Sequence, residues 1–343
     1  MNTIPTIFNE KIPHYTAVGG KERTASNGIS AVILNRPGLP RRYFFQELEK
    51  MGFDNVISVE SSAAHYDIED MSGRFPFVRF ILPEKEINLG ERINLAASEI
   101  ESPLFFVLRS DMKFVAGGTA KRIAERLCVS QEEIPARGEA EEKPVHGENK
   151  TGFKRLCTVP VIMSPNYEVL PTLVSPLTRK RKIKTMFFEP RADGELSLYP
   201  FDGIGVYDRG RFIQIGGYDI TLENTHWQLM DFGFRAFLWG EEIALNFQMK
   251  FFYEGDAPPE DLTVEESYRR FYLKNLAPIF TRDHARLPMY KFPAFFNRSG
   301  VDLLSAWDEF SNGRKWVKKN RYRWKSDARA VTRVWDNAAR PGE

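Results

Sequence analysis

Hydrophobic positions in the first third of the chain alternate between two patterns. Short runs of apolar, often β-branched residues predict buried strands, and apolar residues that recur every three to four positions predict amphipathic helices. The predicted strands cover residues 29–34, 55–59, 77–82 and 104–108, and the predicted helices cover 42–51 and 90–100. Strands that alternate with helices in this way indicate an α/β fold with a mostly parallel sheet and right-handed crossovers.

The pattern changes in the rest of the chain. Residues 131–150 are acidic and poor in large apolar side chains, which predicts a mobile surface insertion. Further strands are predicted at 157–163, 185–188 and 202–206, and a helix at 264–276. Prolines and aromatic residues then accumulate. We therefore expect one α/β domain over residues 1–260 and a helical, aromatic and basic extension over 261–343.

The segment 216–240 combines a glycine pair, a loop that contains acids, and an amphipathic helix. Asp231 is predicted near the start of that helix, and Arg235 follows one turn later. An acid in this place could face a cleft, or it could only favour the positive end of the helix dipole. Both interpretations stay open on this segment alone.

Polar residues follow three of the predicted strands at their carboxyl ends. In open α/β sheets, ligands bind beyond these ends of the strands, so the three polar pairs indicate a binding site. Ordinary polarity of surface loops is the alternative. The pairs are Asn35 with Arg36, Glu60 with Ser61, and Ser110 with Asp111.

Composition narrows the class of protein. The 343 residues include 48 Lys and Arg against 46 Asp and Glu, and a net charge of +2 argues against a chain that binds nucleic acid along its whole length. Cys128 and Cys157 have neither CxxC spacing nor a histidine cluster, which argues against a disulfide framework and a zinc site. We see no signal-peptide pattern and no apolar run of about 18 residues. We therefore expect a cytoplasmic protein.

Four segments, in order, resemble the family 2-like glycosyltransferases of the GT-A fold. They are AVILNRPGLP at 31–40, NVISVESS at 55–62, NLGERINLAASEIESPLFFVLRSDM at 88–112, and GGYD followed by WQLMDFGFRAFLWG within 216–240. The resemblance implies a Rossmann-like nucleotide-binding sheet and an inverting transfer of a sugar from a nucleotide-sugar donor to an acceptor hydroxyl. It also implies a divalent cation, Mg²⁺ or Mn²⁺, and an acceptor that is a cell-envelope glycan or glycolipid.

The resemblance also implies roles for individual residues. Asp111 would bind the metal, and Arg109 could contact a donor phosphate. The other donor-side residues would be Asn35, Arg36, Glu60 and Asn94, and for Asn94 we favour a structural role over a donor-lining one.

On the acceptor side, Asp231 is the first candidate for the general base, because the attacking hydroxyl must lose a proton. Glu223 is the second candidate. His226 and Trp227 would contact the acceptor, and His226 is a third candidate for the base.

Two departures from the family pattern weaken these assignments. Arg109 stands where an acid of the metal motif often lies, so Asp111 is the one carboxylate in that motif. Gln228 and Leu229 occupy the positions where many relatives carry a Glu-Asp pair. The alternative is a catalytically degenerate GT-A domain that binds a glycan, a nucleotide or a protein without turnover.

Basic and aromatic residues mix in the segment 312–335. Such a mixture suits peripheral contact with an anionic membrane surface, and on charge alone it could suit nucleic acid. The third interpretation, which we favour, is a solvated helix whose tryptophans pack onto the domain.

Overall fold

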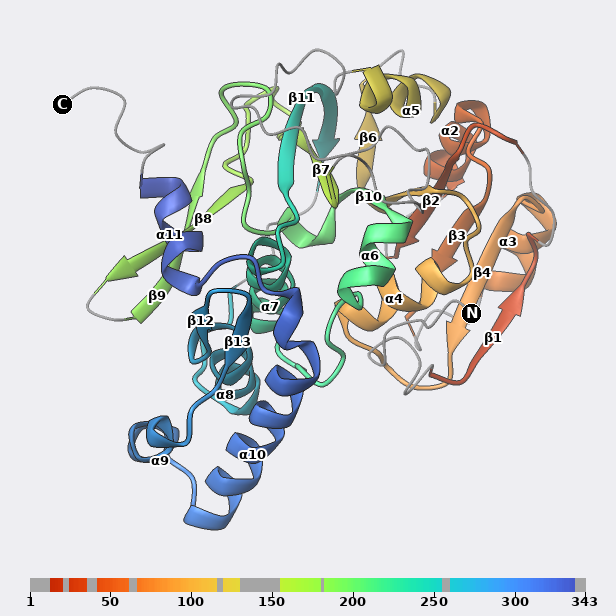
Figure 1. Ribbon diagram of the computed structural model, residues 1–343. Helices are drawn as coiled ribbons and strands as arrows, with labels where there is room; N and C mark the ends of the chain where they lie inside the picture. Colours follow the sequence, from red (N-terminus) through yellow and green to blue (C-terminus); the bar gives the residue numbers. More distant parts are fainter. Residues whose placement is uncertain are drawn as a thin grey trace.

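A computed structural model of the chain describes residues 13–20, 25–35, 42–61, 67–115, 120–129, 155–179, 182–254 and 260–336. The predicted insertion 131–150 and Arg36 lie outside these residues. Nine strands form one sheet in the order β1-β4-β3-β2-β5-β10-β7-β11-β6 (Figure 1). The predicted α/β fold is confirmed.

The first half of the sheet is parallel, as the sequence predicts. Strands β4, β3, β2 and β5 lie side by side and parallel, because helical crossovers return the chain to the same edge each time. Their side chains are buried almost throughout, which explains the continuous apolar runs. The strands are β2 (Ile29–Leu34), β3 (Val56–Val59), β4 (Val78–Pro83) and β5 (Leu104–Arg109), and the helices are α2 (Arg42–Met51), α3 (Ile68–Arg74) and α4 (Leu89–Ser98).

The second half of the sheet reverses direction. Strand β10 (Gly205–Asp208) runs antiparallel to both β5 and β7 (Cys157–Met163), and β7 pairs in parallel with β11 (Ile243–Tyr253). The predicted strand 202–206 begins too early, because Phe201–Gly203 form a 3-10 turn, η2, in which Asp202 has a φ of 51°. The edge strands are β1 (Tyr15–Val18) and β6 (Met112–Phe114), and β8 (Leu173–Arg179) pairs with β9 (Lys182–Phe188) in a separate hairpin.

Helix α7 (Thr225–Leu238) is buried along most of its length. Asn224 caps it, since its side-chain oxygen accepts a hydrogen bond from the backbone N–H of Trp227 at 3.2 Å. Asp231 therefore lies more than a full turn inside the helix, and its predicted position near the helix start is wrong. Asp231 is also too far from the helix start to favour the positive end of the helix dipole, because that interaction is weak beyond the first turn. Helices α5 (Ala120–Val129) and α6 (Arg209–Ile215) complete this part of the chain.

The elements α8 (Glu266–Phe271), the π-helix η3 (Tyr272–Leu276) and α11 (Ala328–Asp336) pack onto α7, and α11 also packs onto β8 (Figure 1). Trp324 and Trp335 are 2% and 7% exposed and belong to the same core as α7, as the solvated-helix interpretation of the basic segment expects. No helix within the described ranges has the length and apolar character to cross a membrane. Further elements here are β12 (Ile279–Thr281), β13 (His284–Arg286), α9 (Phe292–Ser299) and α10 (Leu303–Asn320).

Candidate active site

A cleft of about 420 Å³ opens beyond the carboxyl end of β5. It lies where the sequence predicts a site, next to the point at which the chain switches from one side of β2 to the other. Its lining comes from α4, β5, β9, η2 and α7, from the loops that hold Asn88 and Tyr199, and from Glu260. Its polar and charged residues include Arg92, Arg109, Tyr199, Asp202, His226 and Glu260.

Arg109 and Asp202 form a two-point ion pair in this cleft. The Arg109 Nε donates to Asp202 Oδ2 at 2.6 Å, and the Arg109 Nη2 donates to Asp202 Oδ1. The Tyr253 hydroxyl also donates to Asp202 Oδ2, at 3.3 Å. Burial opposes the charge of Arg109, but Asp202 and, to a smaller extent, Asp111 raise the pKa of its guanidinium above the ordinary value. Arg109 is therefore a fixed cation at the end of β5.

Arg92 brings a second guanidinium from α4. Its Nε donates to the carbonyl of Ile87 at 3.2 Å, and it makes no ion pair with any residue that the structure describes. Burial, and then the positive charge of Arg109, lower the pKa of Arg92. The two arginines thus face one cleft and repel each other there.

His226 and Glu260 form a pair that lines the same cleft. The His226 Nδ1 lies 3.4 Å from Glu260 Oε1, and the His226 side chain is 4% exposed. Thr185 Oγ1 donates to Glu260 at 3.0 Å. Burial would raise the pKa of Glu260, but the hydrogen bonds with His226, Thr185 and Tyr199 lower it. Glu260 is therefore held as a carboxylate that orients the imidazole of His226.

Asn35 and Glu60 are brought together at the ends of β2 and β3. Asn35 Nδ2 donates to Glu60 Oε2 at 2.9 Å, and Ser58 Oγ donates to Glu60 Oε1 at 2.6 Å. Both residues are buried, and neither is among the residues that line the cleft. Their predicted donor-side roles stay predictions.

Asn94 is engaged by the backbone of the glycine loop. Its Nδ2 donates to the carbonyl of Tyr218 at 2.8 Å, and its Oδ1 accepts from the Tyr218 N–H at 2.9 Å. This pair of bonds joins α4 to the segment before α7, which is the contact expected of the structural role.

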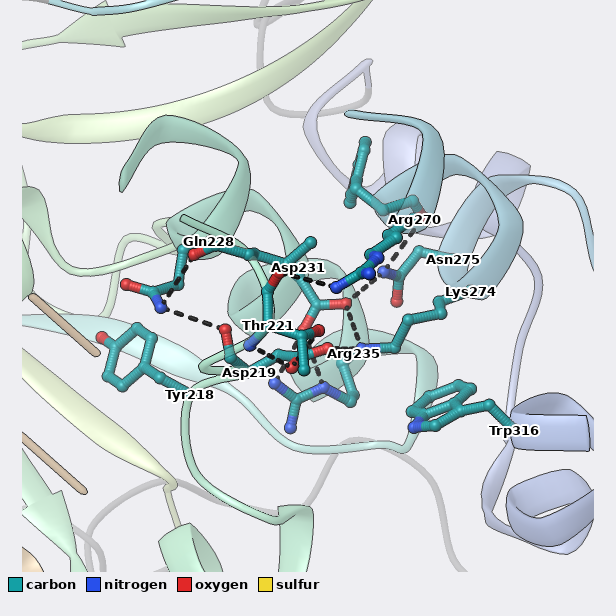
Figure 2. Close-up of polar contacts among 12 residues, drawn as sticks. Tyr218, Asp219, Thr221, Gln228, Asp231, Arg235, Arg270, Lys274, Asn275 and Trp316 are labelled. Atoms are coloured by element: carbon teal, nitrogen blue, oxygen red, sulfur yellow. Dashed lines mark hydrogen bonds and ion pairs between the residues drawn. The ribbon is translucent and has the colours of Figure 1, made fainter. Parts of the chain in front are cut away.

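Asp231 lies in a buried polar network outside the cleft lining (Figure 2). It is 0% exposed, and its Oδ2 accepts from Arg235 Nη2 at 2.8 Å. Its Oδ1 accepts from Asn275 Nδ2 at 2.7 Å and lies 3.3 Å from Lys274 Nζ. A general base must come within hydrogen-bond reach of the proton that it removes. For Asp231 that would require this network to open, and its role as the base stays a prediction.

Asp219, in the glycine loop, belongs to the same network. It accepts from the Thr221 N–H at 3.0 Å and the Thr221 Oγ1 at 2.8 Å, and it forms an ion pair with Lys274. Burial would raise the pKa of Asp219, but Lys274 and Thr221 lower it well below the ordinary value. Lys274, from the extension, therefore connects the loop to α7, beside the ring of Trp316 (Figure 2).

The other acceptor-side candidates separate in space. His226 lines the cleft, whereas Glu223 is exposed and does not. Trp227 turns toward α8, where its ring stacks on Phe271 with centroids 5.6 Å apart and its indole N–H donates to the Thr263 carbonyl at 2.9 Å. The predicted acceptor contact of Trp227 stays a prediction.

The side chains at the end of β5 do not fit a resident divalent cation well. Asp111 lies in the turn between β5 and β6. The Asp202 carboxylate already forms an ion pair with Arg109. Within the described part of the chain, no group of three His, Cys, Asp or Glu side chains is close enough to hold a metal ion. A fixed guanidinium also repels a dication at this point. No step below is therefore assigned to a metal.

Comparisons with known proteins identify the fold. No protein-family model matches the chain, and no curated protein matches it either. It is similar to the crystal structure of GalNAc-T7 with UDP, GalNAc and Mn²⁺, with 12% identity and a TM-score of 0.53. That match covers 91% of this chain and 58% of the GalNAc-T7 chain. The S. aureus TarS structure matches with 10% identity and a TM-score of 0.45, over 83% of this chain and 43% of that chain. The GalNAc-T7 match shows that the chain has the mixed α/β fold of the GT-A type, and its membership of family 2 stays a prediction.

Proposed function

We propose that the chain is a glycosyltransferase that moves a sugar from a nucleotide-sugar donor to an acceptor hydroxyl. One observation carries this proposal: two guanidiniums and a His-Glu pair line one cleft of about 420 Å³ at the carboxyl end of β5. Its volume is in the range of ligand sites, roughly 300–1,000 Å³. The structure of GalNAc-T7, which has a similar fold, contains UDP and GalNAc.

The arginines and the His-Glu pair of the cleft suit the two charge changes of the reaction, on the leaving diphosphate and on the acceptor hydroxyl. When the bond between the sugar and the nucleoside diphosphate breaks, the leaving diphosphate gains negative charge, which Arg92 and Arg109 would stabilise. The acceptor hydroxyl loses its proton as it attacks. Glu260 accepts the Nδ1–H of His226, which leaves Nε2 free to take that proton. Inversion at the anomeric carbon would require this base to act on the face of the sugar away from the diphosphate.

The finer assignments belong to the same proposal. The acceptor would be a cell-envelope glycan or glycolipid, reached in the cytoplasm or at the inner face of the membrane. Asp231, Glu223 and His226 remain the sequence-based candidates for the base, and of these three His226 lines the cleft.

A thermal-shift screen of nucleotide sugars, with and without Mg²⁺ or Mn²⁺, tests donor binding. A ligand that binds the folded chain at 100 times its Kd stabilises it by about 2.7 kcal/mol. We expect one nucleotide class to give a shift of this order. No shift with any nucleotide sugar, in any of the metal conditions, would overturn the proposal.

Variants then separate the candidates for the base. We expect His226→Gln to lower the transfer rate by roughly 10²–10⁴-fold, the usual contribution of a general base, while the donor Kd is unchanged. Asp231→Asn serves as the matched comparison. If His226→Gln transfers at the parental rate and Asp231→Asn is inactive at an unchanged melting temperature, Asp231 is the base.

The contacts of Gln228 favour a second function. Gln228 is fully buried and binds the backbone of Gly90, Asp219 and Leu222, so it holds the loop and does no acid-base chemistry. This suits a GT-A domain that binds a nucleotide or glycan without turnover. Nucleotide binding without transfer or hydrolysis would support that function, and sustained turnover would exclude it.

A further inference from the structure

The charge that a bound cation would supply to the donor is already present in the cleft as two guanidiniums. We propose that Arg92 and Arg109 bind the diphosphate of the donor directly and that donor binding needs no divalent cation. This inference rests on the proposed function and specifies how its donor is recognised.

The first support is the geometry of Arg109. Asp202 takes the hydrogen bonds of Nε and Nη2, which leaves Nη1 without a partner among the described residues. The Asp202 carboxylate is itself held in a left-handed turn and bonded by Tyr253. An arginine fixed on one edge presents its other edge in a defined direction, and the planar guanidinium matches the oxygens of a phosphate.

The second support is Arg92. Its Nε bonds to Ile87, and both of its Nη groups are without a partner among the described residues. Arg92 lines the same cleft as Arg109, and the two positive charges repel each other there. An anion placed between them would relieve that repulsion and satisfy the free N–H groups. A diphosphate, with two adjacent charged groups, is the part of a nucleotide sugar that suits two adjacent guanidiniums.

The third support is the poor fit of a dication. Mg²⁺ and Mn²⁺ prefer carboxylate and other oxygen ligands. At the end of β5, Arg109 binds both carboxylate oxygens of Asp202, and Asp111 raises the pKa of that same arginine. The carboxylates here therefore neutralise a cation that the chain itself provides.

Calorimetric titration of the full chain with UDP, GDP, ADP and dTDP tests the inference in two buffers, one with excess EDTA and one with Mn²⁺. We expect the best of these nucleotides to bind with the same Kd, within about twofold, in both buffers. Arg92→Ala should weaken binding at least tenfold in both. Arg298→Ala is the matched control, because Arg298 is exposed on α9, and it should leave the Kd unchanged.

Arg109→Lys is the second variant, since lysine keeps a charge beside Asp202 but loses the planar geometry. We expect weaker nucleotide binding at an unchanged melting temperature. Binding that needs Mn²⁺ and is insensitive to Arg92→Ala would overturn the inference and leave the proposed function standing. If none of the nucleotides or nucleotide sugars binds in either buffer, the proposed function itself fails.

Discussion

Lys274 is the residue whose replacement should disturb the fold around the site most. It belongs to η3 in the extension, it is 6% exposed, and it forms ion pairs with Asp219 and Asp231. Lys274→Met keeps most of the volume of the side chain and removes its charge. The perturbation therefore isolates the electrostatic connection between the extension, the glycine loop and α7.

The expected loss of stability depends on the partners that Asp219 and Asp231 keep when Lys274 is replaced. Asp231 retains Arg235 and Asn275, whereas Asp219 retains the two hydrogen bonds of Thr221 and no cation from the network. Removing one partner of a buried ion pair costs about 3–5 kcal/mol. Since one of the two carboxylates stays compensated, we expect the lower end, about 3 kcal/mol of the free energy of unfolding.

Urea unfolding followed by tryptophan fluorescence measures this loss. Lys318→Met is the matched control, because Lys318 is exposed on α10 and should change the free energy of unfolding by less than about 0.5 kcal/mol. Adding Asp219→Asn to Lys274→Met removes the uncompensated charge and should restore part of the loss. If Lys274→Met behaves like Lys318→Met, the ion pairs of Lys274 do not stabilise the fold and the reasoning is refuted.

Two further predictions concern acid and helix packing. The pKa of Asp219 is depressed in the folded chain, so its contribution to stability is complete above the ordinary value of about 3.9 and is lost as the pH falls through the folded value. Below about pH 4, the urea midpoint of the parent should decrease more steeply with falling pH than the midpoint of Lys274→Met. Equal slopes for the two proteins would argue against this role of Asp219. Gly233→Ala should destabilise by about 1–3 kcal/mol, because the new Cβ would lie 2.2 Å from the carbonyl oxygen of Leu198. Gly73→Ala, in open space on α3, should be neutral or stabilising by up to about 1 kcal/mol, and equal melting shifts for the two variants would contradict the packing argument.

The sequence was sufficient for the parallel half of the sheet. Strands β2, β3 and β5 are buried on both faces, so each appears as an uninterrupted apolar run, and their polar ends had to meet at one edge. The meeting of Asn35 with Glu60 follows from that geometry alone.

Partners far apart along the chain could not be predicted in the same way. Only tertiary packing brings these partners together, and no local spacing in the sequence predicts them. The pairs are Glu260 with His226, Asp202 with Arg109, and Lys274 with Asp231. Helix α7 begins earlier than predicted, because Asn224 caps a first turn in which polar residues accompany Trp227. Asp231 is likewise bound from outside its own helix, because Lys274 and Asn275 reach it from the extension.

The position of a bound nucleotide tests the central claim most directly. We predict that a crystal structure of the chain with the nucleoside diphosphate identified by titration will show the diphosphate between Arg92 and Arg109, in the cleft that His226 lines. A nucleotide bound elsewhere on the chain, with this cleft filled only by solvent at saturating nucleotide, would contradict the account.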